Sequence, residues 1–406
     1  MIIRIEESLD SRLKFFKFDD RLKEFEEKLR ENKVLVEEDP EDFSILPRII
    51  SKAEDQRIQE MCRVILESAF SALQKYLRNP SVAPTLFHSE YLLSQPFHQN
   101  VLSGNARFDF LKQNDLYKLI EMNFVNVGAI IESTESAALW LQVFPEFRRM
   151  FSYKSPAIHA RSRLQEQDVR NVLLLTRDDY SAQFSDFSER TYLKRMLHPL
   201  ETTILPEREY SRVMFDEKVR LDDITIDAIY PKHLDGTNGK EDALFKREAF
   251  CRSLLSSDVF VFDHFVTMLL ENKDLRFLGN GAVTPYLPKI FDPSELEHVR
   301  DYSGLVLKEK DIHMGKGITI APTSINVPNT IVQERICANS FPVLALDGNS
   351  GKGVFDTGVY VSYRYDINRG SLDICEVAGY LTRFSLTSEI VNISRGGGVI
   401  PTLVER

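Results

Sequence analysis

Acidic, amide and guanidinium side chains occupy matching positions on either side of a turn signal in residues 107–123. Apolar and polar residues alternate through this stretch, as in a β-hairpin with one buried face. When the stretch is folded about residue 115, directly opposed residues point to the same face of the antiparallel pair. The sequence therefore predicts a polar face made of two opposed pairs, Asp109 with Glu121 and Arg107 with Asn123.

The other face of the predicted hairpin is apolar. The same folding places Phe108 opposite Met122 and Phe110 opposite Ile120, so four large apolar side chains would pack into a core. An antiparallel pair with this division buries its apolar face and leaves the polar face available for other contacts.

The polar face is suited to a divalent cation. Two carboxylates held side by side repel each other unless a positive charge neutralises them. Hard oxygen ligands favour Mg²⁺, which is commonly held by one or two carboxylates together with substrate phosphates. Arg107 is then placed for a phosphate. A solvated hairpin face with one ordinary Arg–Asp pair is the alternative that the hairpin alone leaves open.

The remaining segments indicate an α/β protein. Residues 171–176 form a continuous apolar run, which is typical of a strand buried on both faces, and helix and strand patterns alternate around it. Short, mostly alternating or β-branched segments separated by turn residues then indicate an antiparallel, strand-rich lobe. The expected helices are 11–32, 58–77, 134–150, 186–198, 243–255 and 264–278, and the expected strands are 171–176, 202–205, 225–230, 304–308, 318–320, 330–336, 358–363 and 372–377.

A glycine-containing loop follows one of the expected strands. Lys308 closes that strand, and flanking glycines let the next loop fold closely over an anion, where backbone N–H groups and a lysine can hold phosphates. Gln333 and Glu334 on the following strand would then meet the adenine edge or a ribose of a nucleotide. A plain hairpin turn and a solvated strand face are the alternatives. The loop residues are Gly315, Lys316 and Gly317.

Composition limits the classes of function. The chain has 406 residues and a formal net charge of −10 at pH 7, which disfavours a nucleic-acid partner. Its longest apolar runs are far shorter than a membrane span, and the N-terminal residues show no signal-peptide pattern. Four scattered cysteines form no Cys-x-x-Cys pair, so we expect neither a zinc site nor a disulfide framework. These features favour a cytoplasmic protein without a membrane or nucleic-acid partner.

Taken together, the motifs resemble those of the ATP-grasp superfamily, in particular its glutathionylspermidine-synthase-like, circularly permuted branch. Arg-x-Asp-Phe at residues 107–110 and Glu-x-Asn at residues 121–123 match the metal signature of that branch one for one. Residues 272–273 match the Asn-Lys that opens the family's nucleotide lobe. Residues 305–317 resemble its second ATP-binding lysine and phosphate-covering loop, and residues 331–336 resemble the strand that lines its adenine pocket.

The resemblance implies an ATP-grasp fold with three regions. Residues 1–95 would form a mainly helical N-terminal region, and residues 96–255 an α/β central region that contains the metal-binding hairpin and the substrate-binding segments. Residues 256–406 would form the nucleotide-binding lobe and the C-terminal strands.

The implied activity is that of an ATP-dependent carboxylate–amine ligase that uses Mg²⁺ and releases ADP and phosphate. A substrate carboxylate would become an acyl phosphate, and an amine would displace the phosphate to give an amide. An ATP-dependent phosphotransferase and a catalytically silent ATP-binding scaffold are the alternative functions. The implied site consists of Asp109, Glu121 and Asn123 for the metal, Arg107 for catalysis, and Lys273, Lys308, Gly315, Lys316, Gly317, Gln333 and Glu334 for ATP.

The resemblance does not define the substrates. Asn126 and Gly128 replace the small polar residues that contact the thiol peptide in glutathionylspermidine synthase, which argues against glutathione and a polyamine. Small-molecule or peptide carboxylates and amines are the expected partners, with a carrier protein or a peptide terminus as further options. The candidate substrate-binding residues are Asn126, Gly128, Asp178, Asp179, Asp227, Lys232 and Arg383.

Overall fold

The computed structural model has the mixed α/β fold expected from the sequence. It describes residues 18–34, 42–84, 92–93, 99–125, 127–176, 185–232, 248–279, 281–296, 298–310, 317–325, 329–346, 348–391 and 397–406. Within these ranges, no helix has the length and apolar character needed to cross a membrane. The α-helices described are α2 (Phe18–Glu31), α3 (Lys52–Arg78), α5 (Ile130–Val143), α6 (Pro156–Gln165), α7 (Ser185–Met196) and α9 (Glu248–Leu255).

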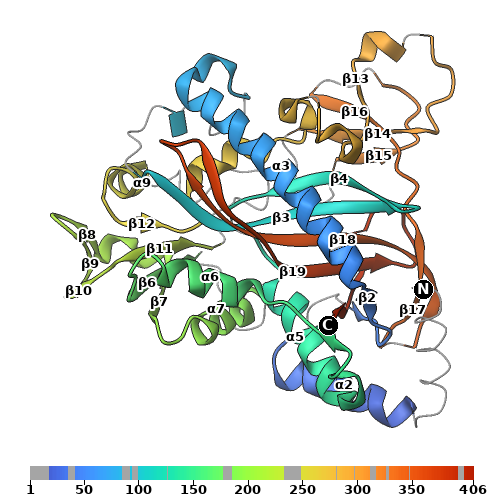
Figure 1. Ribbon diagram of the computed structural model, residues 1–406, viewed down its shortest axis with the longest axis horizontal. Helices are drawn as coiled ribbons and strands as arrows, with labels where there is room; N and C mark the ends of the chain where they lie inside the picture. Colours follow the sequence, from blue (N-terminus) through green and yellow to red (C-terminus); the bar gives the residue numbers. More distant parts are fainter. Residues whose placement is uncertain are drawn as a thin grey trace.

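The largest sheet contains the predicted hairpin. Its strands are β1 (Asp42–Phe43), β3 (Val101–Gln113), β4 (Leu116–Asn123), β17 (Ser340–Leu344), β18 (Ser350–Asp366), β19 (Ser371–Ser385) and β20 (Gly398–Ile400). They lie in the order β1-β20-β19-β18-β3-β4, with β17 paired to β18. The long strands β18 and β19 cross the molecule beside the hairpin (Figure 1). This one sheet draws strands from all three regions expected from the sequence, whose boundaries stay a prediction.

The register of the β3–β4 hairpin confirms both predicted polar pairs. Arg107 lies opposite Asn123, and Asp109 lies opposite Glu121. The apolar pair of Phe108 and Met122 is also confirmed.

The second apolar pair of the hairpin is different from the prediction. Phe110 lies opposite Leu119, not Ile120, because the register shifts by one residue beyond Asp109. The chain turns through Asn114 and Asp115, with Asn114 in the left-handed region at φ 56°. The two-residue turn is centred between Asn114 and Asp115, half a residue before the centre at residue 115 that the prediction used. Ile120 is an extra residue in β4, and beyond it the pairing agrees with the predicted polar pairs.

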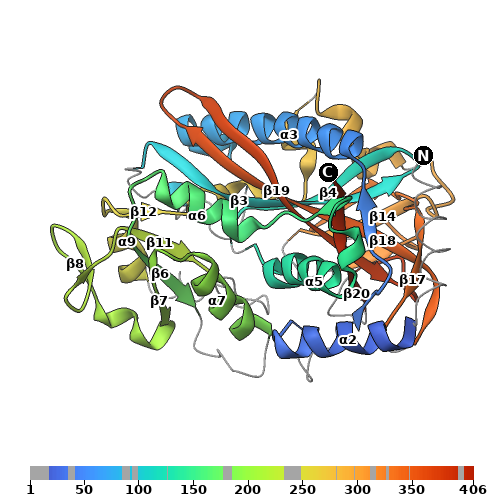
Figure 2. The ribbon, with the colours of Figure 1, turned by 60° about the horizontal axis from the view of Figure 1, so that its bottom comes forward.

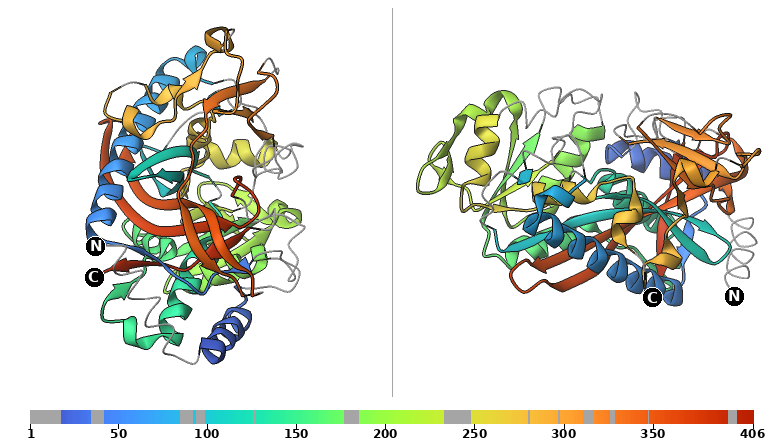
Figure 3. Two further views of the ribbon diagram at one scale, coloured as in Figure 1. Left: turned by 90° about the vertical axis from the view of Figure 1, so that its right-hand side faces the viewer. Right: turned by 90° about the horizontal axis from the view of Figure 1, so that it is seen from above.

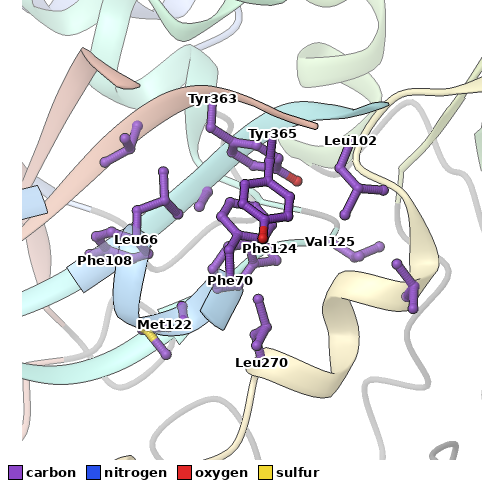
Figure 4. Close-up of a cluster of buried hydrophobic side chains, with 14 of the residues drawn as sticks. Leu66, Phe70, Leu102, Phe108, Met122, Phe124, Val125, Leu270, Tyr363 and Tyr365 are labelled. Atoms are coloured by element: carbon purple, nitrogen blue, oxygen red, sulfur yellow. The ribbon is translucent and has the colours of Figure 1, made fainter. Parts of the chain in front are cut away.

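Helix α3 covers one face of this sheet. Ser51 begins the helix by accepting a hydrogen bond from the Glu54 backbone N–H (3.2 Å), and Pro80 follows its end. The apolar spacing that predicted a helix over 58–77 forms its buried stripe. Figure 4 shows Phe70 of this stripe against Phe124 and Tyr365, and the Phe70 and Tyr365 ring centroids lie 4.3 Å apart. Phe124 in turn contacts Phe108 of the hairpin, with ring centroids 5.9 Å apart. The hairpin is therefore anchored through its apolar face.

Helices α5 and α6 lie on the opposite face of the sheet (Figure 2). Helix α2 packs on α5, and Trp140 of α5 donates from its indole N–H to the Ile45 carbonyl (2.8 Å). A small sheet of β2 (Arg48–Ile50), β5 (Phe151–Ser152) and β21 (Thr402–Glu405) adjoins this layer. The polar face of the hairpin is thus directed toward the α5 side of the molecule.

A parallel sheet adjoins the hairpin sheet. It is formed by β6 (Asn171–Thr176), β7 (Glu201–Pro206), β11 (Ala228–Pro231) and β12 (Phe260–Val261), in the order β12-β11-β6-β7. The buried strand predicted at 171–176 is confirmed as a central strand. A ribbon of β8 (Val213–Phe215), β9 (Val219–Leu221) and β10 (Ile224–Thr225) projects beyond this sheet (Figure 1).

A four-stranded antiparallel sheet lies beside the hairpin (Figure 3). Its strands are β13 (Ile290–Phe291), β14 (Leu305–Glu309), β15 (Ile318–Ile320) and β16 (Thr330–Glu334), in the order β13-β16-β14-β15. Three of the five strands predicted for the strand-rich lobe form this sheet, together with β13, which was not expected from the sequence. The other two, predicted at 358–363 and 372–377, are parts of β18 and β19 in the hairpin sheet, so the single predicted lobe is divided between two antiparallel sheets.

The helix predicted at 264–278 is wrong. Two short 3₁₀-helices occupy this segment, η4 (Phe265–Leu270) and η5 (Leu275–Leu278). Between them, the Asn272 side chain accepts from the Asp274 backbone N–H (2.9 Å), and Asp274 accepts from Arg276 N–H (3.2 Å). Such side-chain bonds compete with a continuous helix. The other 3₁₀-helices described are η1 (Pro80–Val82), η2 (Pro145–Phe147), η3 (Glu207–Arg212), η6 (Thr284–Tyr286) and η7 (Pro293–Leu296).

Candidate functional site

Arg107 and Asp109 form a buried ion pair on the polar face of the hairpin. Arg107 donates from Nε to Oδ1 of Asp109 (2.7 Å) and from Nη2 to Oδ2 (2.9 Å), and Asp109 is 1% exposed. Burial raises the pKa of this carboxyl, but the charges of Arg107 and Arg383 outweigh burial and hold the pKa of Asp109 below its ordinary value. Asp109 is therefore a carboxylate at neutral pH.

Arg383 reaches the same carboxylate from β19, across the intervening strand β18. Its Nη2 donates to Oδ2 of Asp109 (3.1 Å). Its Nε and Nη2 also donate to Oδ1 (3.0 Å) and Oδ2 (2.6 Å) of Asp356 on β18. The structure thus brings Arg383, which the sequence predicted as a substrate residue, to the polar face of the hairpin. We call Arg107, Asp109, Asp356 and Arg383 the arginine–aspartate cluster.

Two members of this site were missed at the level of sequence, Asp356 and Gly358. A Cβ added to Gly358 would lie 2.9 Å from Asp109 Oδ1 and 3.0 Å from Arg107 Cδ. The absent side chain therefore leaves the space in which Arg107 meets Asp109 beside β18. The available signal was a glycine inside a strand pattern, which often marks a close approach.

Lys308 connects the antiparallel sheet to the hairpin. Its Nζ donates to the carbonyl of Ile120 (3.0 Å), the extra residue of β4 that precedes Glu121. Burial lowers the pKa of Lys308 to about 8, with Glu121 raising it and Lys273 lowering it further. Lys273 itself donates to the Glu309 carbonyl (3.0 Å). The two predicted ATP lysines therefore lie together, next to a predicted metal ligand.

The predicted adenine strand also faces this region. Gln333 is 2% exposed, and its Oε1 has no hydrogen-bond partner among the described residues. A buried acceptor without a partner lowers the stability of the unliganded protein, and an N–H donor of a ligand could satisfy it. Glu334 lies 4.0 Å from Lys118 of β4, so β16 and the hairpin are in contact.

The turn after the hairpin is held by polar contacts on both sides. The Gly128 carbonyl accepts from Arg107 Nη1 (3.2 Å) and from the Tyr360 hydroxyl (2.8 Å). Buried Lys232 donates to the Val127 carbonyl and lies 3.1 Å from Glu189. Two predicted substrate residues, Gly128 and Lys232, are therefore brought close to Arg107. Lys232 follows β11, at the carboxyl end of the parallel sheet, where ligands commonly bind in such sheets.

Other predicted residues are not brought to this cluster or cannot be placed. Asp227 accepts from the backbone N–H groups of Arg170 (3.0 Å) and Asn171 (2.8 Å), at the amino end of the parallel strands and so away from Lys232. Gly317 has a left-handed φ of 67°, and its carbonyl accepts from the Glu309 backbone N–H (2.9 Å). The remaining candidates lie outside the described residues: Asn126, Asp178, Asp179, Gly315 and Lys316.

The donor set of the hairpin fits Mg²⁺ bound together with a ligand. No group of three His, Cys, Asp or Glu side chains in the described part of the chain could hold a metal ion alone. Asp109 and Glu121 supply two carboxylates and Asn123 an amide oxygen, and Mg²⁺ commonly takes so few protein ligands when phosphates complete its shell. Asn123 points its Nδ2 at the Arg107 carbonyl (3.5 Å), which leaves its oxygen for another partner.

No protein-family model matches the chain, and no curated protein matches its sequence. A glutathione synthetase-like effector from Globodera pallida, solved in its apo form, matches over 94% of this chain and 96% of that chain, with a TM-score of 0.71 and 11% identity. The chain shares the fold of that effector.

A second solved structure is only distantly similar. It comes from Methylobacillus flagellatus KT and carries a provisional gamma-glutamylcysteine synthetase designation. The TM-score is 0.41 at 12% identity, over 82% of this chain and 86% of that chain.

Proposed function

We propose that this chain is an ATP-dependent carboxylate–amine ligase of the ATP-grasp type. The observation that carries the proposal is the hydrogen bond from Lys308 Nζ to the Ile120 carbonyl. This bond places Lys308, with its neighbour Lys273, against the hairpin that carries the carboxylates of Asp109 and Glu121. Cations on one side and carboxylates on the other are the arrangement that a metal–nucleotide complex requires.

The nucleotide would lie between these two lysines and the carboxylates of the hairpin. Gln333 Oε1 would accept from an adenine N–H, and Lys273 and Lys308 would neutralise phosphate oxygens. Mutual repulsion of the two lysines in the free protein favours an incoming anion. Asp109, Glu121 and Asn123 would hold the Mg²⁺ that accompanies ATP, and the bound ion would neutralise phosphate charge.

The reaction would run in two displacement steps. A carboxylate oxygen of the first substrate attacks the γ-phosphorus, the bond to the bridging oxygen breaks, and ADP leaves. Arg107 and Arg383 donate to the equatorial oxygens on which negative charge accumulates. An amine of the second substrate then attacks the acyl carbon, and phosphate leaves with an oxygen that came from the carboxylate.

The acyl substrate would enter next to the turn at residues 127–130. Gly128 adjoins Arg107, and Lys232 and Glu189 fix the same turn from the parallel sheet. The fold shared with a glutathione synthetase-like effector supports an amide-forming reaction of this kind. It names neither the acid nor the amine, and a small molecule, a peptide terminus or a carrier protein fits the proposal.

ADP release measured across panels of amino acids, short peptides and amines tests the proposal, with mass spectrometry of each product. A ligase requires two co-substrates and yields an amide. When the carboxylate carries ¹⁸O, one ¹⁸O atom should appear in the released phosphate, because the acyl phosphate is cleaved at its carbonyl carbon.

Other outcomes of this experiment would contradict the ligase. A stable phosphorylated product formed from one co-substrate would indicate a phosphotransferase. Phosphate free of ¹⁸O would show that ATP is hydrolysed by water without an acyl phosphate. No ADP release under any condition would favour a silent scaffold.

A further inference from the structure

Asp356 is a buried carboxylate to which the proposed reaction assigns no direct role. It is 1% exposed and lies on β18 directly opposite Arg383 of β19, to which it is joined by two hydrogen bonds of 2.6 and 3.0 Å. Burying such a pair is seldom a net gain in stability over apolar residues of the same size. Its position therefore calls for an explanation other than stability.

Asp109 has two arginine partners in the structure, which leaves it poorly suited to bind a metal ion at the same time. Its two oxygens accept three N–H bonds, two from Arg107 and one from Arg383. A carboxylate offers about four lone-pair sites, and a cation bound to it would be repelled by both guanidinium groups. Binding of Mg²⁺ and a phosphate therefore requires the arginines to exchange Asp109 for the incoming anion.

Each arginine has a second anchor for this exchange. Arg107 also donates to the Gly128 carbonyl (3.2 Å), and Arg383 also donates to Asp356. Asp356 lies on β18, one strand from Asp109 on β3 and two strands from Glu121 and Asn123 on β4, so it can keep Arg383 while Asp109 turns to the cation. Without this anchor, the freed guanidinium would have no fixed direction.

We propose that Asp356 is a positioning residue, which holds Arg383 toward the transferring phosphoryl group when Asp109 binds the metal. The inference rests on the proposed ATP-dependent reaction and deepens it. Asp356 acts through Arg383 and touches no reacting atom itself.

Strand β18 offers a matched control. Asp366, near its other end, also accepts two hydrogen bonds from one arginine residue, from the Nε (2.7 Å) and backbone N–H (2.9 Å) of Arg369. Arg369 is exposed, whereas Arg383 is largely buried. Asp366→Asn therefore removes the same charge from the same strand without reaching the site.

The test measures ADP release at saturating ATP and Mg²⁺, with the acid and amine identified in the screen above. Asp356→Asn should lower this rate about tenfold or more, while Asp366→Asn retains the rate of the unmodified chain. In an Arg383→Ala background, Asp356→Asn should cause no further loss, because a positioning residue has nothing left to position.

Four outcomes decide the inference. A rate for Asp356→Asn equal to that of Asp366→Asn overturns it, and so does an equal loss with and without Arg383. If Asp356→Asn does not fold, Asp356→Ser, which also removes the carboxylate, replaces it, and an unchanged rate in that variant overturns the inference. If the unmodified chain releases no ADP, the proposed function and this inference fail together.

Discussion

The hairpin takes part in two buried charge clusters that differ in what surrounds them. Near its turn, Glu54 of α3 accepts from Lys112 Nζ (2.6 Å), the Tyr117 hydroxyl (2.6 Å) and Arg48 Nη2 (3.4 Å). Arg48 is in turn covered by the Phe355 ring, 4.6 Å from its centroid. Burial raises the pKa of Glu54, but these partners outweigh burial and lower it. We call Glu54, Lys112, Tyr117 and Arg48 the closed cluster, because Glu54 is paired with both cations of the group.

The arginine–aspartate cluster, which we call the open cluster, lies next to further charged side chains. It borders Glu121, Lys308 and Lys273, where two like charges lie together and the pKa of Lys308 is lowered to about 8. In the described part of the chain, Glu121 accepts no hydrogen bond that would neutralise it. Ion pairs of similar chemistry thus lie in two settings. The closed cluster joins helix α3 to the hairpin, and the open cluster is the one that we propose exchanges partners with a ligand.

The largest expected effect is the loss of turnover when a carboxylate in the open cluster or at its border is removed. Asp109→Asn and Glu121→Gln should each lower ADP release a hundredfold or more, about 3–4 kcal/mol, because contacts made to developing charge are lost. Circular dichroism should show that both variants fold. Normal ADP release in both would remove the basis for the metal assignment.

The closed cluster should show the reverse pattern. Glu54→Gln should lower the free energy of unfolding by about 2 kcal/mol, since charged hydrogen bonds to Lys112 and Arg48 are weakened. ADP release per folded molecule should stay unchanged. Urea titration measures the first effect, and loss of activity without loss of stability would contradict the distinction between the clusters.

Lys308→Ala should weaken ATP binding about tenfold, or roughly 1.4 kcal/mol, and leave binding of the acyl substrate almost unchanged. The charge removed faces the phosphates in the proposed site. Lys352→Ala, which removes an exposed lysine on β18, is the control. Calorimetric titration that gives the same ATP affinity for both variants and the unmodified chain would exclude Lys308 from the nucleotide site.

The smallest effect comes from adding one methyl group. Gly358→Ala should destabilise the chain by about 1 kcal/mol and disturb the Arg107–Asp109 contact, because the new Cβ has no room. At Gly304 a Cβ would meet nothing within 4 Å, so Gly304→Ala should have no such effect. Thermal unfolding and ADP release of the two variants compare the sites directly, and identical behaviour would argue against a close approach over β18.

Local patterns made the hairpin predictable from sequence. Alternation of polar and apolar residues gave the two faces, and the turn residues gave the centre, so Asp109 and Glu121 could be paired without a structure. The bulge at Ile120 was not predictable, because an extra residue leaves the alternation readable on both sides.

Residues that depend on distant strands were not foreseen. Asp356 and Gly358 enter the site only because β18 pairs with β3 in one particular register. The break at Asn272 was missed for a different, local reason, since the apolar spacing around it fits a helix while its side chain favours a turn. Lys308 was expected near phosphates from its place before a glycine loop, but its bond to Ile120 required the two sheets to meet.

Thermal unfolding of the unmodified chain and of Asp109→Asn, each with ATP plus Mg²⁺ and with ATP plus EDTA, tests the central claim most directly. Ligand at a hundredfold excess over its Kd should stabilise the unmodified chain by about 2.7 kcal/mol with Mg²⁺, and EDTA should abolish the gain. Asp109→Asn should show no Mg²⁺-dependent gain. Equal stabilisation with and without Mg²⁺, or full stabilisation of Asp109→Asn, would contradict a metal–nucleotide site on the hairpin.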